Sequence, residues 1–357
     1  MFTLLIFLIV IAALVLSHEF GHFIVAKWKG MRVDEFGFGF PPRIFGKQYG
    51  ETTYTLNLLP FGGFVKIWGE DDAEGGTDPC NFAARSAWDR FLVLVAGVFM
   101  NVVLAYLLFT VGHIIGVPSV VDAGEGARDA VVRVVDVVPG SPAAAAGMVP
   151  GDAILTLQAG SEEISIVDIE EVQEFVKAHA GEEVHVGLEH GGQQVDLSVV
   201  LRSEAPAGEG LLGIAMAKVG IIKTPWYRAP WEGLRTTIST TKFVAVGLVS
   251  FFANIFSVDV VNSVAGPIGI AQVAGEASAL GFVYLLQLVA VLSVNLAILN
   301  ILPIPALDGG RVLFLIIEKV RGKPVSLHVS QFAHTVGFIV LILLMLVVTY
   351  FDITRIF

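Results

Sequence analysis

The sequence has few charged residues and almost no cysteine. Only 15% of its 357 residues are Asp, Glu, Lys or Arg, and 55% are apolar, which is far from the balance of a soluble globular domain. The single cysteine, Cys80, excludes an intramolecular disulfide and a cysteine-rich metal site. The composition therefore indicates a membrane protein that is surrounded largely by the lipid bilayer.

The sequence also lacks an excess of basic residues. Its formal net charge is −11, and residues 117–226 alone hold 17 Asp and Glu against 6 Lys and Arg. Nucleic acids attract basic surfaces and repel acidic ones, because their phosphates are negatively charged. We therefore expect no nucleic-acid partner.

Four apolar segments are each long enough to cross a bilayer, which takes about 20 helical residues. They are residues 2–25, 91–117, 282–302 and 332–350. The first is not a signal peptide, because it lacks a basic start, is too long, and contains His and Glu. A fifth and shorter apolar segment, 243–256, is expected to continue an interfacial helix that begins at Trp231. We therefore predict a polytopic α-helical membrane protein with about four transmembrane helices.

Lysine and arginine gather in two segments between these spans, 27–90 and 311–323. Cytoplasmic loops carry an excess of these residues, so both segments are predicted to be cytoplasmic. With four crossings, both termini are then extracytoplasmic, together with the acidic 117–226 region.

Residues 128–220 form short β-branched runs separated by turns, with one helical pattern, "VDIEEVQEFVKAHAG" (167–181), whose final glycine suits a helix C-cap. The stretch "VVPGSPAAAAGMVPGDAILTL" (137–157) resembles the PDZ domains of bacterial envelope proteases. Such domains bind extended peptides at a sheet edge. We expect one extracytoplasmic, β-rich, PDZ-like domain that recognises peptides or filters substrates, with a structural spacer as the alternative.

The first basic segment contains two stretches that are typical of strands, "GFGFPP" (37–42) and "TTYTLNLLPFGGF" (52–64). They predict a membrane-associated β-hairpin region. We expect residues 52–59 to offer a strand edge to an unwound substrate, and an ordinary cytoplasmic hairpin is the alternative.

The first apolar segment contains "HEFGH", in which His18 and His22 share one helix face four residues apart. This H-E-x-x-H pattern binds zinc through its histidines and uses the glutamate, here Glu19, as a general base. An ionisable side chain inside a bilayer costs on the order of 2.5–3.5 kcal/mol. A bound cation would offset that cost better than the alternative, histidines that are satisfied only by hydrogen bonds.

A third zinc ligand is needed if water is to occupy the fourth position. Asp308 is the candidate, because it follows prolines that break the helix in "NLAILNILPIPALDGGR" (295–311), and irregular backbone at membrane depth occurs only where it is buried or lines a cavity. With four spans, His18, His22 and Asp308 all reach the cytoplasmic side. The remaining histidines, His334 among them, are interpreted as surface or interfacial residues.

The chain resembles the site-2 protease family of intramembrane zinc metalloproteases, particularly the bacterial regulator-of-sigma-E protease group. The motifs that carry the resemblance are "HEFGH" (18–22), "LPFGGFVK" (59–66), "GPIGI" (266–270) and "NILPIPALDGG" (300–310). The resemblance implies Zn²⁺ held by His18, His22 and Asp308, with Glu19 activating water and Asn300 binding the substrate backbone. It differs from many relatives in having room for one PDZ-like domain instead of two.

The resemblance also implies a function and a location. We expect an intramembrane zinc endopeptidase of the bacterial inner membrane, which cleaves transmembrane helices of single-span substrates, such as anti-sigma factors or signal-peptide remnants, in regulated intramembrane proteolysis. The site would face the cytoplasmic side, and an upstream site-1 protease is a further candidate partner. The alternatives are a zinc transporter, which would not need Glu19, and an inactive receptor that uses only the PDZ-like domain.

Four regions are expected from these patterns. They are a membrane core with the HExxH helix and hairpin (1–116), the PDZ-like domain (117–226), an interfacial or re-entrant segment (227–275), and a second membrane core with the LDG motif (276–357).

Overall fold

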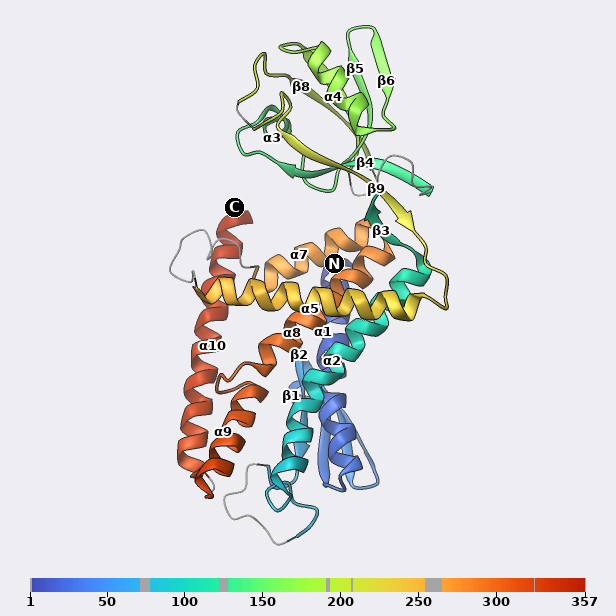
Figure 1. The fold of residues 1–357 in the computed structure, drawn as a ribbon. Coiled ribbons are helices and arrows are strands. Elements are labelled where there is room, and N and C mark those ends of the chain that lie inside the picture. Colours follow the sequence, from blue (N-terminus) through green and yellow to red (C-terminus); the bar gives the residue numbers. More distant parts are fainter. Residues whose placement is uncertain are drawn as a thin grey trace. The chain divides into compact units, whose positions relative to one another are not determined.

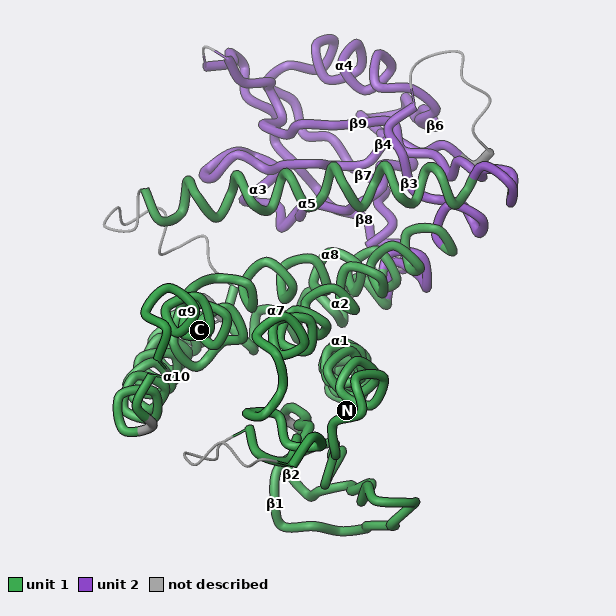
Figure 2. The backbone as a smooth tube through the Cα atoms, turned by 60° about the horizontal axis from the view of Figure 1, so that its bottom comes forward, with its two compact units in different colours: residues 1–111, 229–278, 285–357 green, residues 112–228, 279–284 purple. Residues whose placement is uncertain are grey.

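The computed structural model describes residues 2–70, 78–121, 128–190, 193–206, 208–253, 265–323 and 325–356. The chain divides into two compact units, which Figure 2 colours separately. Unit 1 comprises residues 1–111, 229–278 and 285–357, and unit 2 comprises residues 112–228 and 279–284. Unit 1 is mainly helical, and unit 2 is mainly β-structure (Figure 1).

The segments predicted to span the membrane are helical. The long helices are α1 (Phe2–Trp28), α2 (Ala87–Ile115), α5 (Ala229–Ala253), α8 (Phe282–Ile301) and α10 (Leu327–Ile356). Each of these five is long and apolar enough to cross a membrane, judged by length and composition. Two shorter helices, α7 (Pro267–Leu280) and α9 (Asp308–Arg321), complete the described helices of unit 1. The protein is therefore a multi-pass membrane protein.

Helix α5 differs from the other long helices in direction. In Figure 1 it runs across the direction of α1 and α10, and in Figure 2 it lies apart from both helices. It is one continuous helix of 25 residues, and residues 254–256 of the predicted apolar segment lie outside the described residues. A Cβ at Gly233 would come within 2.2 Å of Thr110 Oγ1 on α2. Glycine at this position therefore allows α5 to lie directly against α2.

The predicted hairpin is present in unit 1. Strand β1 (Val33–Tyr49) pairs antiparallel with β2 (Thr52–Ile67). The long strands bend back on themselves, so that Thr53 pairs with both Gln48 and Glu35, while Glu35 also pairs with Lys66. Residues 53–56 are thus hydrogen-bonded to neighbours on both sides. The expectation that residues 52–59 offer a free strand edge is therefore wrong for residues 53–56, whereas the segments around 43–49 and 63–67 are each paired on one side only.

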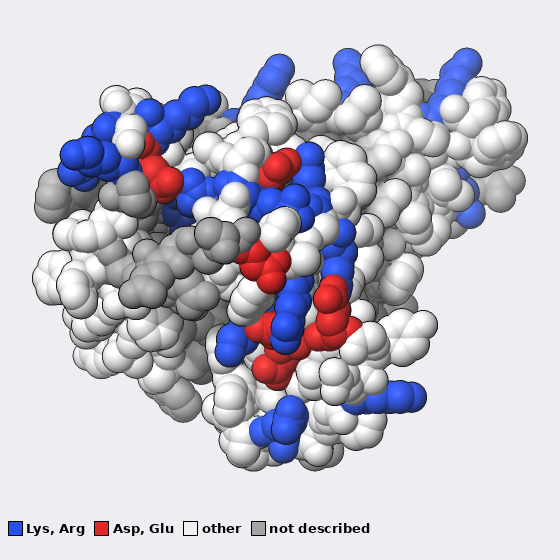
Figure 3. All heavy atoms as spheres, turned by 90° about the horizontal axis from the view of Figure 1, so that it is seen from below, with Lys and Arg blue, Asp and Glu red and all other residues white. Residues whose placement is uncertain are grey.

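The two basic segments lie at the same end of unit 1, where α1 and α9 end and α2 begins (Figure 1). Seen from that end, Lys and Arg side chains gather beside a few carboxylates (Figure 3). Two of the ion pairs there are Lys29–Asp89 at 2.8 Å and Arg90–Glu318 at 2.6 Å. Segments that are far apart in the sequence therefore share one charged face.

The described residues of unit 2 form a seven-stranded sheet and two helices. The strands lie in the order β3-β9-β4-β5-β7-β8, and β6 pairs with β5. Their bounds are β3 Val117–Val120, β4 Arg128–Val137, β5 Ala153–Ala159, β6 Glu162–Ser165, β7 Glu183–His190, β8 Gln193–Val200 and β9 Ile214–Ile222. The β-rich character that the sequence predicts for this region is confirmed.

The two helices of unit 2 begin at side-chain caps. Helix α3 (Pro142–Ala146) begins after Ser141, whose hydroxyl accepts the Ala144 N–H, and α4 (Ile169–Ala178) begins with a capping box at Asp168. The predicted C-cap at Gly181 is wrong. Helix α4 ends at Ala178 with His179 as its C-cap, and Gly181, at φ +82°, serves the turn that follows.

Candidate metal centre

Helix α1 presents two imidazoles to the interior of unit 1. His18 and His22 lie one turn apart and are both buried, with ring centroids 4.8 Å apart and Nε2 atoms 3.2 Å apart. Positions i and i+4 of a helix face the same way, so the geometry follows directly from the spacing of the motif.

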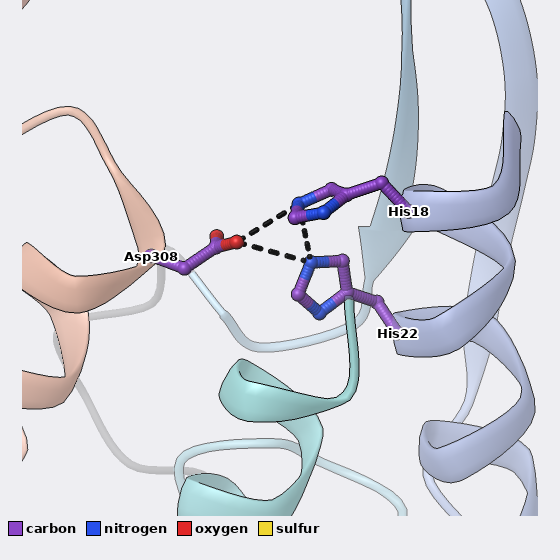
Figure 4. Close-up of side chains that lie close together, drawn as sticks. All are labelled: His18, His22 and Asp308. Atoms are coloured by element: carbon purple, nitrogen blue, oxygen red, sulfur yellow. Dashed lines mark hydrogen bonds and ion pairs between the residues drawn. The ribbon is translucent and has the colours of Figure 1, made fainter. Parts of the chain in front are cut away.

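Asp308 meets these imidazoles from a distant part of the chain. It is the first residue of α9 and follows the irregular segment that ends α8. Its Oδ2 lies 2.9 Å from His18 Nε2 and 3.4 Å from His22 Nε2 (Figure 4). The structure therefore brings together the three residues that the sequence predicts as ligands.

The three converging atoms fit a zinc ion. Asp308 Oδ2 is buried, and the described residues offer it no well-aligned hydrogen-bond donor. Tetrahedral ligands at about 2.0–2.1 Å from zinc lie about 3.3 Å from one another, and the observed separations are 2.9, 3.2 and 3.4 Å. Two neutral imidazoles and one carboxylate are ligands that zinc prefers, and three protein ligands leave the fourth position open.

Helix α2 orients both imidazoles. The Nδ1–H of His22 can donate to the Val93 carbonyl oxygen at 2.8 Å, which leaves Nε2 with its lone pair towards the site. The amide of Asn101, which is fully buried, lies 3.3 Å from His18 Nδ1. Ser293 on α8 donates to the Asn101 carbonyl oxygen at 2.8 Å. Each imidazole is thus held through the nitrogen that does not face Asp308.

Glycines allow α1 and α2 to approach closely at the site. A Cβ at Gly97 would lie 2.3 Å from His22 Nε2, and a Cβ at Gly21 would lie 2.3 Å from the Ala96 carbonyl oxygen. Sequence reasoning missed Gly97 and Asn101. The signal that could have identified them is their i, i+4 spacing, which puts a glycine and an amide on one face of an apolar helix.

Glu19 lies beside the three ligand atoms. It is half-buried and lines a cavity of about 180 Å³ together with His22, Asp308 and Arg311. Residues 63–65 of β2 line the same cavity, and a Cβ at Gly63 would lie 3.3 Å from Glu19 Cγ. The carboxylate therefore faces a space next to the ligands that could hold water and a peptide.

Asn300 also reaches the site. It lies at the end of α8, and its Nδ2 is 3.5 Å from both ring nitrogens of His18. This places the predicted substrate-binding side chain over one imidazole, where it is only partly buried.

The segment before Asp308 is strained and is held by α10. Among the described residues, Ala306 is the only non-glycine residue with a positive φ, +80°, which costs on the order of 1–3 kcal/mol. Its N–H donates to His334 Nδ1 at 3.0 Å. His334 is half-buried against this segment, so the interpretation of it as a surface or interfacial residue misses its contact with the loop.

These observations define a candidate metal centre inside an apolar helical unit. A profile of peptidase family M50 matches residues 6–344 of the chain. The chain is 31% identical to the zinc metalloprotease RasP of Geobacillus kaustophilus, over 98% of this chain and 97% of the relative. It is 30% identical to the regulator of sigma-W protease RasP of Bacillus subtilis, over 99% of both chains.

The chain belongs to peptidase family M50, the site-2 protease family, as the sequence motifs predict. It is a zinc metalloprotease, and zinc is its cofactor. The predicted enzyme class and metal are thereby confirmed.

Proposed function

We propose that the protein is an intramembrane zinc endopeptidase that cleaves transmembrane helices of single-span substrates. The observation that carries this proposal is the convergence of His18, His22 and Asp308, with Glu19 beside them, within a unit whose helices are apolar enough to lie in lipid. We assign the first three as zinc ligands and Glu19 as the general base.

A bound Zn²⁺ supplies Lewis acidity, which polarises a peptide carbonyl and makes water nucleophilic near neutral pH. The Glu19 carboxylate takes a proton from the attacking water and returns it to the leaving amine. The imidazoles of His18 and His22 are oriented by the contacts of their Nδ1 atoms with the Asn101 amide and the Val93 carbonyl oxygen. Asn300, at the rim of the site, is placed to hold the substrate backbone.

The substrate must be extended at the scissile bond, because a helix hides its carbonyls in internal hydrogen bonds. We assign the free edge around residues 63–67 of β2 to this task, since residues 63–65 line the cavity beside Glu19. An added strand would pair with this edge through backbone hydrogen bonds. Proline substitutions at Phe64 and Val65 test this assignment. Along a strand, successive N–H groups point to opposite sides, so only one of these two N–H groups points to the free edge. Proline at that position should lower cleavage without unfolding the hairpin. Equal cleavage by both variants and the unmodified protein contradicts this assignment.

The proposed substrates are anti-sigma factors or signal-peptide remnants in regulated intramembrane proteolysis, with an upstream site-1 protease as a partner. The name of the Bacillus subtilis relative, a regulator of sigma-W protease, favours the anti-sigma class. Unit 2 is proposed to be a PDZ-like, extracytoplasmic module that filters substrates. The proposed division of the chain into four regions is 1–116, 117–226, 227–275 and 276–357.

The protein is proposed to lie in the inner membrane with both termini extracytoplasmic and the metal centre towards the cytoplasm. Two observations support four crossings: α5 runs across the direction of α1 and α10, and the basic segments share one end of unit 1 (Figures 1 and 3). Cys80, an exposed thiol, reports this orientation. It should resist an impermeant maleimide in spheroplasts and react in inside-out vesicles, and the opposite pattern would reverse the orientation.

The decisive experiment separates metal binding from proton transfer. Purified Glu19→Gln should retain about one zinc per chain and cleave a single-span substrate about 10²–10⁴-fold more slowly, whereas Asp308→Asn should weaken both zinc binding and cleavage. A chelator should inhibit the unmodified protein reversibly. Undiminished cleavage by Glu19→Gln would exclude the proposed base.

A further inference from the structure

Helix α10 presents a histidine to the metal-binding loop although most of its surface is apolar and exposed. In the turns around it, Phe332 is 72% exposed and Phe338 is 58% exposed, whereas Gly337 is buried. His334 and Gly337 are three residues apart and therefore share one helix face. A polar side chain on a lipid-facing helix is costly and is generally retained for a function.

That face of α10 lies directly on the segment that precedes Asp308. A Cβ at Gly337 would lie 2.2 Å from the Pro305 carbonyl oxygen, so the two backbones are in contact. One turn away, His334 Nδ1 accepts the Ala306 N–H at 3.0 Å. Accepting at Nδ1 requires the neutral imidazole with its proton on Nε2.

The segment needs an external partner because its conformation is unfavourable for alanine. Ala306 has a φ of +80°, in the left-handed region that glycine adopts readily and alanine does not. The loop is otherwise closed on its own backbone: a Cβ at Gly309 would lie 2.2 Å from the carbonyl oxygens of Ile301 and Leu302. A rotation at Ala306 would therefore carry Asp308, two residues later, away from the imidazoles.

We propose that His334 is a positioning residue for the metal centre: by accepting the Ala306 N–H it holds the strained turn that delivers Asp308 to His18 and His22. This inference rests on the proposed ligand role of Asp308. It gives α10 a part in metal binding although α10 supplies no ligand to the site.

The test uses the purified full-length protein and measures zinc affinity by competition with a chelator. His334→Phe keeps a ring beside Phe314, which lies 5.6 Å from the His334 ring, but removes the acceptor. We expect it to weaken zinc binding by about 10- to 100-fold, the usual effect of removing a group that orients a ligand. His334→Asn retains an acceptor oxygen and should keep most of the affinity. Thr335→Ala, at an exposed neighbouring position of α10, serves as the matched control.

A second-site substitution separates positioning from general damage to the helix. Glycine adopts positive φ without strain, so Ala306→Gly introduced into His334→Phe should restore most of the zinc affinity. The visible absorption of the Co²⁺-loaded proteins should change in His334→Phe and return in the double variant. A helix that merely packs badly would not be repaired in this way.

The outcomes distinguish this inference from the proposed function. Weakened zinc binding in Asp308→Asn with unchanged binding in His334→Phe overturns the role of His334 alone. Failure of Ala306→Gly to restore binding overturns it as well. Unchanged zinc binding in Asp308→Asn overturns the ligand assignment and, with it, this inference.

Discussion

Unit 2 is built around Val, Ile and Leu side chains, whereas unit 1 buries most of the polar side chains of the chain. Of the twelve largest fully buried side chains in the described ranges, nine belong to unit 2. Of the twelve buried polar residues in the same ranges, ten belong to unit 1, and His18, His22 and Asn101 are among them. The two units therefore keep their structure by different means.

The difference follows from the solvent. In water, burying apolar area stabilises a fold by about 25 cal/mol per Å², and unit 2 collects its apolar side chains in one core. In lipid this driving force between helices is absent, and helices associate through close packing of small residues and through hydrogen bonds. In unit 1, Gly21, Gly97 and Gly233 allow this close packing of helices. The hydrogen bond from Ser293 to the Asn101 carbonyl oxygen is one of the contacts of the second kind, between polar groups.

The largest loss of zinc affinity is expected at Gly97, where unit 1 has no room for a side chain. In Gly97→Ala the new methyl group would overlap His22 Nε2, at 2.3 Å, so the imidazole must leave its place. We expect zinc affinity to fall by more than about 100-fold, measured as zinc bound per purified chain at limiting metal. Phe99→Leu, at a 63% exposed position of the same helix, is the control and should bind zinc normally. Normal binding by Gly97→Ala would show that the site tolerates a larger side chain.

The second prediction removes apolar volume from unit 2. Leu157 is completely buried in its core, and Leu157→Ala should destabilise this unit by about 2–5 kcal/mol. Hydrogen exchange of β5 and β7 amides in the full-length protein measures the loss, and zinc binding should be unchanged. Val200→Ala, at a 64% exposed position, should have little effect. If Leu157→Ala also releases zinc, the two units do not fold independently.

A smaller effect is expected at a buried carboxylate far along the chain from the ligands. Asp352, near the end of α10, accepts the N–H groups of Gly266 and Gly269 at 3.0 and 2.9 Å, at the start of α7. Asp352→Asn loses one charged acceptor and should cost about 1–3 kcal/mol locally. Faster hydrogen exchange at Gly266 and Gly269, with zinc binding retained, is the expected result. Exchange as slow as in the unmodified protein would show that the contact contributes nothing.

The smallest effect concerns a partly buried ion pair in unit 2. Lys218 Nζ donates to Asp168 Oδ2 at 2.7 Å, and this hydrogen bond lowers the pKa of the Asp168 carboxyl below its ordinary value of 3.8. The pair therefore stabilises unit 2 above that pH, and its contribution is lost as the pH falls through the lowered pKa. In Lys218→Met the melting temperature of unit 2 should depend less on pH in this acidic range. Lys223→Met removes the same charge from unit 2 and is the control. The pH dependence of its melting temperature should equal that of the unmodified protein.

The sequence predicts the ligand set because ionisable residues are rare in apolar helices. His18, Glu19 and His22 stand out in the first span, and Asp308 stands out after a helix broken by prolines. Gly97 and Asn101 do not stand out, since a glycine and an amide are common in membrane helices and gain their meaning only when α2 packs on α1. The role proposed for His334 depends on a backbone angle at Ala306, which no pattern in the sequence specifies.

The hairpin shows a second limit of sequence patterns. Alternation predicts that residues 52–64 form a strand, and β2 confirms it. Alternation says nothing about how many neighbours a strand has, and β1 and β2 are long enough to bend and pair twice. The free edges consequently lie around residues 43–49 and 63–67, on either side of the predicted segment. Likewise, the apolar content of α5 allows a crossing, and only its direction in the fold favours the membrane surface.

The ligands of the proposed centre come from opposite ends of the chain, His18 and His22 from α1 and Asp308 from the start of α9. Translation delivers the two imidazoles to the membrane first and the carboxylate only after most of the polypeptide has been made. An elongating chain therefore carries an incomplete set of the proposed ligands until residue 308 has been added. Proteolytic competence arrives in one step, when α9 is in place.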